Sequence, residues 1–130
     1  MAHPVEEQHR QLAILFEDTR AALDRAEPGA AREPFERLRE ALDAHFELED
    51  HLYYPPIAAL RPRHKAVVSG IAEAHARFRT AFGEIASALE GGVVSEARRA
   101  FAEFTESFAR HEVIEEELVR ALESEGAAAG

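Results

Sequence analysis

Apolar residues recur at helical spacing along most of the chain. Steps of three and four residues run through two stretches, one at Phe35, Leu38, Leu42, His45, Glu49 and Leu52, the other at Phe101, Phe104, Phe108, His111, Glu115, Leu118 and Leu122. This spacing is typical of a helix that turns one stripe of side chains toward a core. No stretch of useful length alternates as a strand would.

Glycine and proline divide these stretches at Pro28-Gly29, at Pro55-Pro56 with Arg61-Pro62, and at Gly91-Gly92. The segments between them predict helices at roughly 4–26, 33–54, 63–90 and 94–124, the second with Pro34 in its first turn. Short connections between four helices predict an all-α fold, an antiparallel up-down-up-down four-helix bundle. We expect residues 1–130 to form a single domain whose tail, from about 125 to 130, is flexible.

The two halves of the chain repeat each other at an offset of 66 residues. His9 corresponds to His75, and the pairs Phe35/Phe101, His45/His111, Glu49/Glu115 and Leu52/Leu118 follow at the same offset. Each half therefore carries a histidine and, 36 residues later, the pattern His-x-x-x-Glu. The repeat predicts a pseudo-twofold bundle in which both half-sites meet at the centre.

The histidines and glutamates of the repeat are candidate metal ligands. Residues four apart project from the same side of a helix, so an imidazole and a carboxylate at that spacing can bind one ion. Four imidazoles and two carboxylates pointing inward from four helices match the plan of a two-metal site, which suits iron, manganese or zinc better than copper(I). The alternative is a set of paired core residues. It would leave two carboxylates buried at a cost of several kcal/mol, with no lysine or arginine on the same stripes to neutralise them.

Composition excludes several other classes of protein. The chain has 25 acidic and 15 basic residues and a formal net charge of -10, which disfavours nucleic acid and anionic membranes as partners. The absence of cysteine excludes disulfides, iron–sulfur clusters and thiolate zinc sites. The polar start and the lack of an 18-residue apolar run lead us to expect a cytoplasmic protein without a membrane span.

Two segments resemble the signatures of the hemerythrin-like family, the HHE cation-binding domains. These are HFELEDHLYYP at 45–55 and HEVIEEEL at 111–118, and the resemblance extends from about His9 to Leu122. It implies a four-helix bundle around a non-heme di-iron centre, with an oxo or hydroxo bridge. Carried over by position, the terminal ligands would be His9, His45, His75 and His111, and the bridging carboxylates Glu49 and Glu115.

The chain departs from the pattern of oxygen-carrying hemerythrins, which place two histidines four residues apart on the third helix. Here Ile71 and Arg79 occupy the positions at that spacing from His75. The carriers also place the fourth-helix carboxylate five residues after its histidine, which would select Glu116, whereas the repeat selects Glu115. We therefore expect Glu116 to be a metal ligand or to lie just outside the ligands. A missing histidine favours reaction with peroxide, nitric oxide or oxygen, or their sensing, over simple oxygen carriage.

Tyr53 is the candidate for the missing ligand because it lies four residues after Glu49. It could coordinate metal, donate a hydrogen bond to Glu49 or a bound ligand, or simply fill the end of the bundle. We expect Tyr54 to be structural and Asp50 to lie beside the ligands or at a solvated edge. The remaining histidines, His3, His51 and His64, are expected to be non-ligands.

These residues support three interpretations of function. The first is a redox-active di-iron protein that binds or reacts with a diatomic molecule or peroxide, in a dry pocket of phenylalanines (Phe16, Phe46, Phe78, Phe82, Phe104 and Phe108). Turnover would need an electron donor that the sequence does not identify, so its status as an enzyme is open. The second is a non-catalytic module that senses oxygen, nitric oxide or iron, or stores iron. The third is a structural zinc or metal-free bundle.

Overall fold

The computed structural model describes residues 4–25 and 27–129, and within them every long element is helical. The long helices are α1 (Pro4–Asp24), α2 (Pro28–Glu47), α4 (Lys65–Glu90) and α5 (Val94–Ala129). A π-helical segment η1 (Leu48–Tyr53) continues α2 into the short helix α3 (Tyr54–Leu60), and a 3-10 turn η2 (Pro62–His64) leads into α4. The fold class expected from the apolar spacing, all-α, is therefore confirmed.

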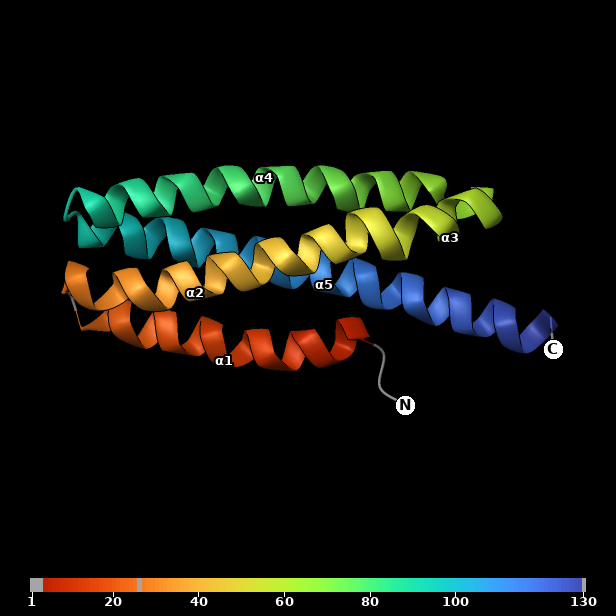
Figure 1. Ribbon diagram of the computed structural model, residues 1–130, viewed down its shortest axis with the longest axis horizontal. Coiled ribbons are helices and arrows are strands. Elements are labelled where there is room, and N and C mark those ends of the chain that lie inside the picture. The colour runs from red at the N-terminus through yellow and green to blue at the C-terminus, as the bar shows by residue number, and fades with distance from the viewer. Residues whose placement is uncertain (1–3, 26, 130) are drawn as a thin grey trace.

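The long helices lie side by side along the long axis of the molecule (Figure 1). Helix α1 packs against α2 and α5, and α4 packs against α2 and α5. The α1–α2 and α4–α5 connections lie at one end, whereas α3 and η2 form the connection at the other (Figure 1). No helix in the described part of the chain is long and apolar enough to cross a membrane.

The core consists of two apolar clusters. The larger, which we call the aromatic cluster, contains Phe35, Phe46, Phe78, Phe82, Phe101, Phe104 and Phe108 together with leucine and alanine side chains. The smaller, which we call the tyrosine cluster, has Tyr54, Ile71 and Leu118 at its centre, with Tyr53, Ile57, Val68 and Leu122 packed around them. Helical spacing explains both, because residues three or four apart on one helix meet the same neighbours.

Helix boundaries differ from those expected at several places. Helix α2 begins at Pro28, so Pro34 lies inside the helix and not in its first turn. Proline fits the first helical position because its missing N–H would have no partner there, which explains the earlier start. The third long helix begins at Lys65 after the η2 turn, and α5 continues through Ala129. Glu125, in the expected tail, lies 3.0 Å from His64 Nε2 and also pairs with Arg63.

The π-helical segment η1 changes which residues of the second helix face inward. The backbone N–H of Tyr54 donates to the Glu49 carbonyl, five residues earlier, so one extra residue is accommodated in this turn. Pro55 and Pro56 follow directly and lack the N–H groups that an α-helix would use here. Leu52, which we expected on the buried stripe, is 71% exposed as a result, whereas Leu118 is buried. The expectation for Leu52 was therefore wrong.

Candidate metal centre

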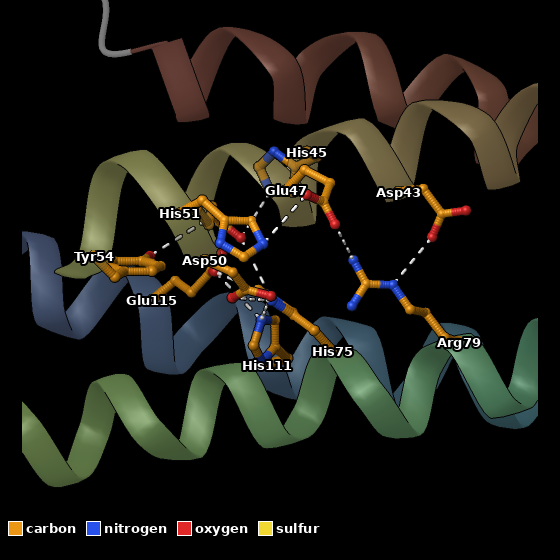
Figure 2. A network of polar contacts seen from close by, with 11 residues as sticks. Asp43, His45, Glu47, Asp50, His51, Tyr54, His75, Arg79, His111 and Glu115 are labelled. Atoms are coloured by element: carbon orange, nitrogen blue, oxygen red, sulfur yellow. Dashed lines mark hydrogen bonds and ion pairs between the residues drawn. The ribbon is translucent and has the colours of Figure 1, made fainter.

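Four elements bring polar side chains into the interior between the two apolar clusters. His45 comes from the last turn of α2, Glu49 from η1, His75 from α4, and His111 and Glu115 from α5 (Figure 2). All five side chains are buried, with exposures between 0% and 4%. Within the described residues, the structure thus brings together five of the six proposed ligands.

The ligand atoms of four of these residues form one compact group. One atom from each of Glu49, His75, His111 and Glu115 lies within 4.8 Å of the others. His75 Nε2 lies 3.2 Å from Glu49 Oε1 and 3.2 Å from His111 Nε2. His45 Nε2 lies 3.3 Å from the same Glu49 oxygen, and His111 Nε2 lies 3.3 Å from Glu115 Oε1. The two His-x-x-x-Glu pairs therefore converge on one small volume.

Asp50 fixes the orientation of one imidazole in this group. Its Oδ1 lies 2.8 Å from His75 Nδ1, at the opposite edge of the ring from the cluster. When Nδ1 carries the proton and donates a hydrogen bond to Asp50, the lone pair of Nε2 points into the group. Carboxylates that accept from the outer nitrogen of a metal-binding histidine hold the ring in this way. Asp50 is thus placed to support a ligand rather than to serve as one.

The electrostatics of the group favour a positively charged occupant. Burial, reinforced by the nearby Glu115 carboxyl, raises the pKa of Glu49 well above its ordinary range. Burial lowers the pKa of His75, and the neighbouring His111 acts in the same direction while Asp50 opposes both. Glu49 Oε1 accepts no hydrogen bond within the described residues. A buried carboxylate oxygen in that position is costly unless a cation or proton compensates it.

Tyr54 donates a hydrogen bond to Glu49. The Tyr54 hydroxyl lies 3.3 Å from Glu49 Oε2, and its ring is buried, whereas Tyr53 is half-buried with its ring 4.8 Å from that of Tyr54. Burial raises the pKa of Tyr54, so the phenol is protonated here. The physical reason is η1, since an i to i+5 turn aligns Glu49 with residue 54. The Pro55-Pro56 pair is the sequence signal that could have indicated this change.

Other candidate residues lie away from the group. Glu116 is exposed and pairs with Arg120 at 4.0 Å, because it follows Glu115 by one residue and so points about 100° further round the helix. His51 is exposed and pairs with Glu47 at 3.3 Å, and His64 pairs with Glu125 at the bundle end. The side chain of His9 lies outside the described residues, as does His3.

The two positions where oxygen carriers would have a further histidine take structural roles. Ile71 is buried in the tyrosine cluster. Arg79 pairs with Asp43 at 3.3 Å and with Glu47 at 3.5 Å (Figure 2). Its guanidinium lies 5.6 Å from the centre of the Phe46 ring. These contacts with α2 explain the position of the Arg79 side chain, and they require no role for it at the metal centre.

Aromatic rings close one side of the group. The Phe46 ring stacks on His75 with centroids 4.1 Å apart, and Phe78 meets His111 edge-on at 5.2 Å. Phe108 lies 6.1 Å from His111 and also contacts Phe16 at 5.2 Å. These rings exclude water from one side of the cluster and lower the local dielectric constant, which strengthens charge interactions inside it.

Comparison with known proteins agrees with this arrangement. The family model of the hemerythrin HHE cation-binding domain matches residues 1–122. Neither a curated protein nor a solved structure matches the chain significantly.

Proposed function

Since the chain belongs to the hemerythrin HHE cation-binding family, we propose that it binds a pair of iron ions and uses them to bind or react with small oxidants. The proposed oxidants are oxygen, peroxide and nitric oxide. We further propose that the four helices form an antiparallel up-down-up-down bundle, whose two halves are pseudo-twofold repeats that contribute equivalent ligands. When bound, the iron pair would supply redox chemistry and a positive charge at the centre.

The observation that carries this proposal is the buried Glu49, His75, His111 and Glu115 group, whose ligand atoms lie within 4.8 Å of one another. Nitrogen and oxygen donors without thiolate suit iron, with manganese and zinc as alternatives. In this proposal Glu49 and Glu115 would hold the ions as shared carboxylates, and His9, His45, His75 and His111 would be terminal ligands. Glu49 Oε1, which accepts no hydrogen bond within the described residues, fits such an occupant, because a cation would compensate its burial.

The protein's own residues prepare the site in three ways. Asp50 holds His75 so that Nε2 faces the cluster, which fixes the tautomer a metal requires. Tyr54 donates to Glu49 Oε2, which orients that carboxylate and leaves Oε1 directed at the two histidines. The rings of Phe46 and Phe78 cover His75 and His111 and keep bulk water away. Tyr54 is also the phenol best placed to reach a bound metal or oxidant.

Metal analysis tests the first part of the proposal. We expect about two irons per chain in the protein as purified, and their loss in H45A and H111A variants. His51 provides the matched control, because it lies six residues from His45 but is exposed, so H51A should retain the metal. Absence of iron from the wild type, or unchanged iron in both H45A and H111A, would contradict the proposal.

Mixing experiments separate reaction from storage or sensing. The reduced, iron-loaded protein is mixed anaerobically with peroxide, nitric oxide or oxygen, and consumption is followed over many equivalents. Consumption of more than two equivalents per iron pair, given a supplied electron donor, supports an enzyme. A reversible adduct with one ligand per iron pair supports a binding module. Iron uptake without any effect of the oxidants would leave only storage.

A further inference from the structure

A groove between α4 and α5 reaches the candidate metal centre from the side of the bundle. Its volume is about 760 Å³, and its lining includes Gly70, Ala74, Phe78, Phe104, His111 and Ile114. Glycine and alanine leave space between the two helices that larger side chains would fill. The floor of the groove is therefore apolar and contains one imidazole of the cluster.

The bundle axis offers a less open route to the cluster. On one side the aromatic cluster is packed with rings, among them Phe46 and Phe108. On the other side lies the tyrosine cluster, centred on Tyr54 and Leu118, both nearly inaccessible. Glu49 and His75 are 0% exposed, whereas His111 retains 4% exposure at the groove. Among the four clustered residues of the described chain, His111 is thus the one that outside molecules approach most readily.

The rim of the groove indicates the charge of a suitable ligand. It carries three acids and two bases, namely Glu73, Glu84, Glu103, Arg77 and Arg110. Arg110 is paired with Glu106 at 3.0 Å, which leaves the rim no excess of positive charge. The chain as a whole has a net charge of -10. Anions are disfavoured by this field, whereas uncharged molecules are unaffected by it.

We propose that the α4–α5 groove is the entry and binding site through which uncharged small molecules reach His111. The volume lies within the range of pockets that hold small organic molecules and exceeds what a diatomic needs. The class of ligands that fits the groove therefore extends from hydrogen peroxide to a small organic hydroperoxide with an apolar tail. That these molecules go on to reach a metal pair rests on the function proposed above. The groove and its access to His111 do not depend on that function.

One substitution should fill the groove, and another should open it above His111. A Cβ at Gly70 would meet nothing within 4 Å, so G70F adds a ring to the groove without a backbone clash. Ile114 is 47% exposed and lies one turn after His111, where a helical side chain leans back over the preceding turn. I114A should therefore uncover His111. Gly83 lies on the same helix, has equally open space and is not part of the groove lining, so G83F is the matched control.

Histidine acylation by diethyl pyrocarbonate, an uncharged probe, measures the access directly. The full chain without metal is labelled after its helicity has been verified, and modification of each histidine is followed by mass spectrometry. Exposed His51 is the internal reference. We expect G70F to slow labelling of His111 about fivefold or more, and I114A to accelerate it about twofold or more, since close packing excludes the probe. G83F should match the wild type.

The proposal is overturned if neither G70F nor I114A changes the His111 rate relative to His51, or if G83F slows it as much as G70F. A second measurement uses the iron-loaded protein and nitric oxide, followed by stopped-flow absorbance. G70F should slow association while the amount bound stays the same. Because the acylation experiment needs no metal, a failure of the di-iron proposal and a failure of the groove proposal give different results.

Discussion

Raising the pH should destabilise the metal-free protein, and Glu49 is the main reason. The pKa of this buried carboxyl lies well above its ordinary value of 4.5, first because of burial and second because of Glu115. In the unfolded chain Glu49 ionises near that ordinary value. The folded state therefore holds a proton that the unfolded state has lost, and stability decreases as the pH rises above 4.5.

The size of the effect follows from the proton difference. One extra proton on the folded state costs about 1.4 kcal/mol of stability for each pH unit. Between pH 7 and 8.5 the free energy of unfolding should then fall by about 2 kcal/mol. This range is chosen because of His75, whose lowered pKa has the opposite consequence. Its stabilising contribution is lost only as the pH falls below the ordinary histidine value of 6.5, outside the range.

Urea denaturation followed by circular dichroism is the assay, applied to metal-free wild type and the E49Q variant from pH 7 to 8.5. The amide of E49Q cannot ionise, so the slope should decrease by about one proton, or about 2 kcal/mol over the range. With metal bound, the ion replaces the proton on Glu49, so the slope should also be smaller than in the metal-free wild type. A wild-type stability that is constant or rising over this range, or an unchanged slope in E49Q, would refute the reasoning.

Three further predictions concern neighbouring residues. Y54F should alter the visible spectrum of the ferric protein more than Y53F does, because the Tyr54 hydroxyl lies 3.3 Å from Glu49 Oε2 in the cluster. D50N should weaken iron affinity about 10- to 100-fold in competition with a chelator, since His75 loses its orienting carboxylate. L52S should leave the free energy of unfolding within about 0.5 kcal/mol of the wild type. L118A should lower it by about 2–5 kcal/mol, because only Leu118 is buried.

Each of these predictions has an outcome that contradicts it. A spectrum that changes in Y53F but not in Y54F would show that Tyr53 influences the iron and that Tyr54 does not. For D50N the matched control is D43N, since Asp43 pairs with Arg79 on the outside of the bundle, and equal affinity losses in both would indicate a general effect. Similar destabilisation by L52S and L118A would contradict the change of register at η1.

The helical spacing of apolar residues was sufficient to predict the four long helices, and the internal repeat added the five described residues of the candidate site. Helix period alone makes His45 and Glu49 neighbours, as it does His111 and Glu115. The position of His75 against both pairs was expected from the repeat. Its contacts with Glu49 and His111 depend on how α4 packs against α2 and α5. The spacing of residues within one helix contains no information about the distances from His75 to Glu49 and His111.

The sequence by itself therefore determined which residue types lie on the inner stripes, because side chains three and four apart must share a face. Beyond Glu49 it predicted Leu52 on the buried stripe, but Leu52 is exposed and Tyr54 is buried. Only the tertiary structure decided this, since a π turn shifts the phase of a helix by one residue and the choice depends on packing. Tyr53 and Ile57 now join Leu118 and Leu122 in one cluster, at an offset of 65 residues instead of 66.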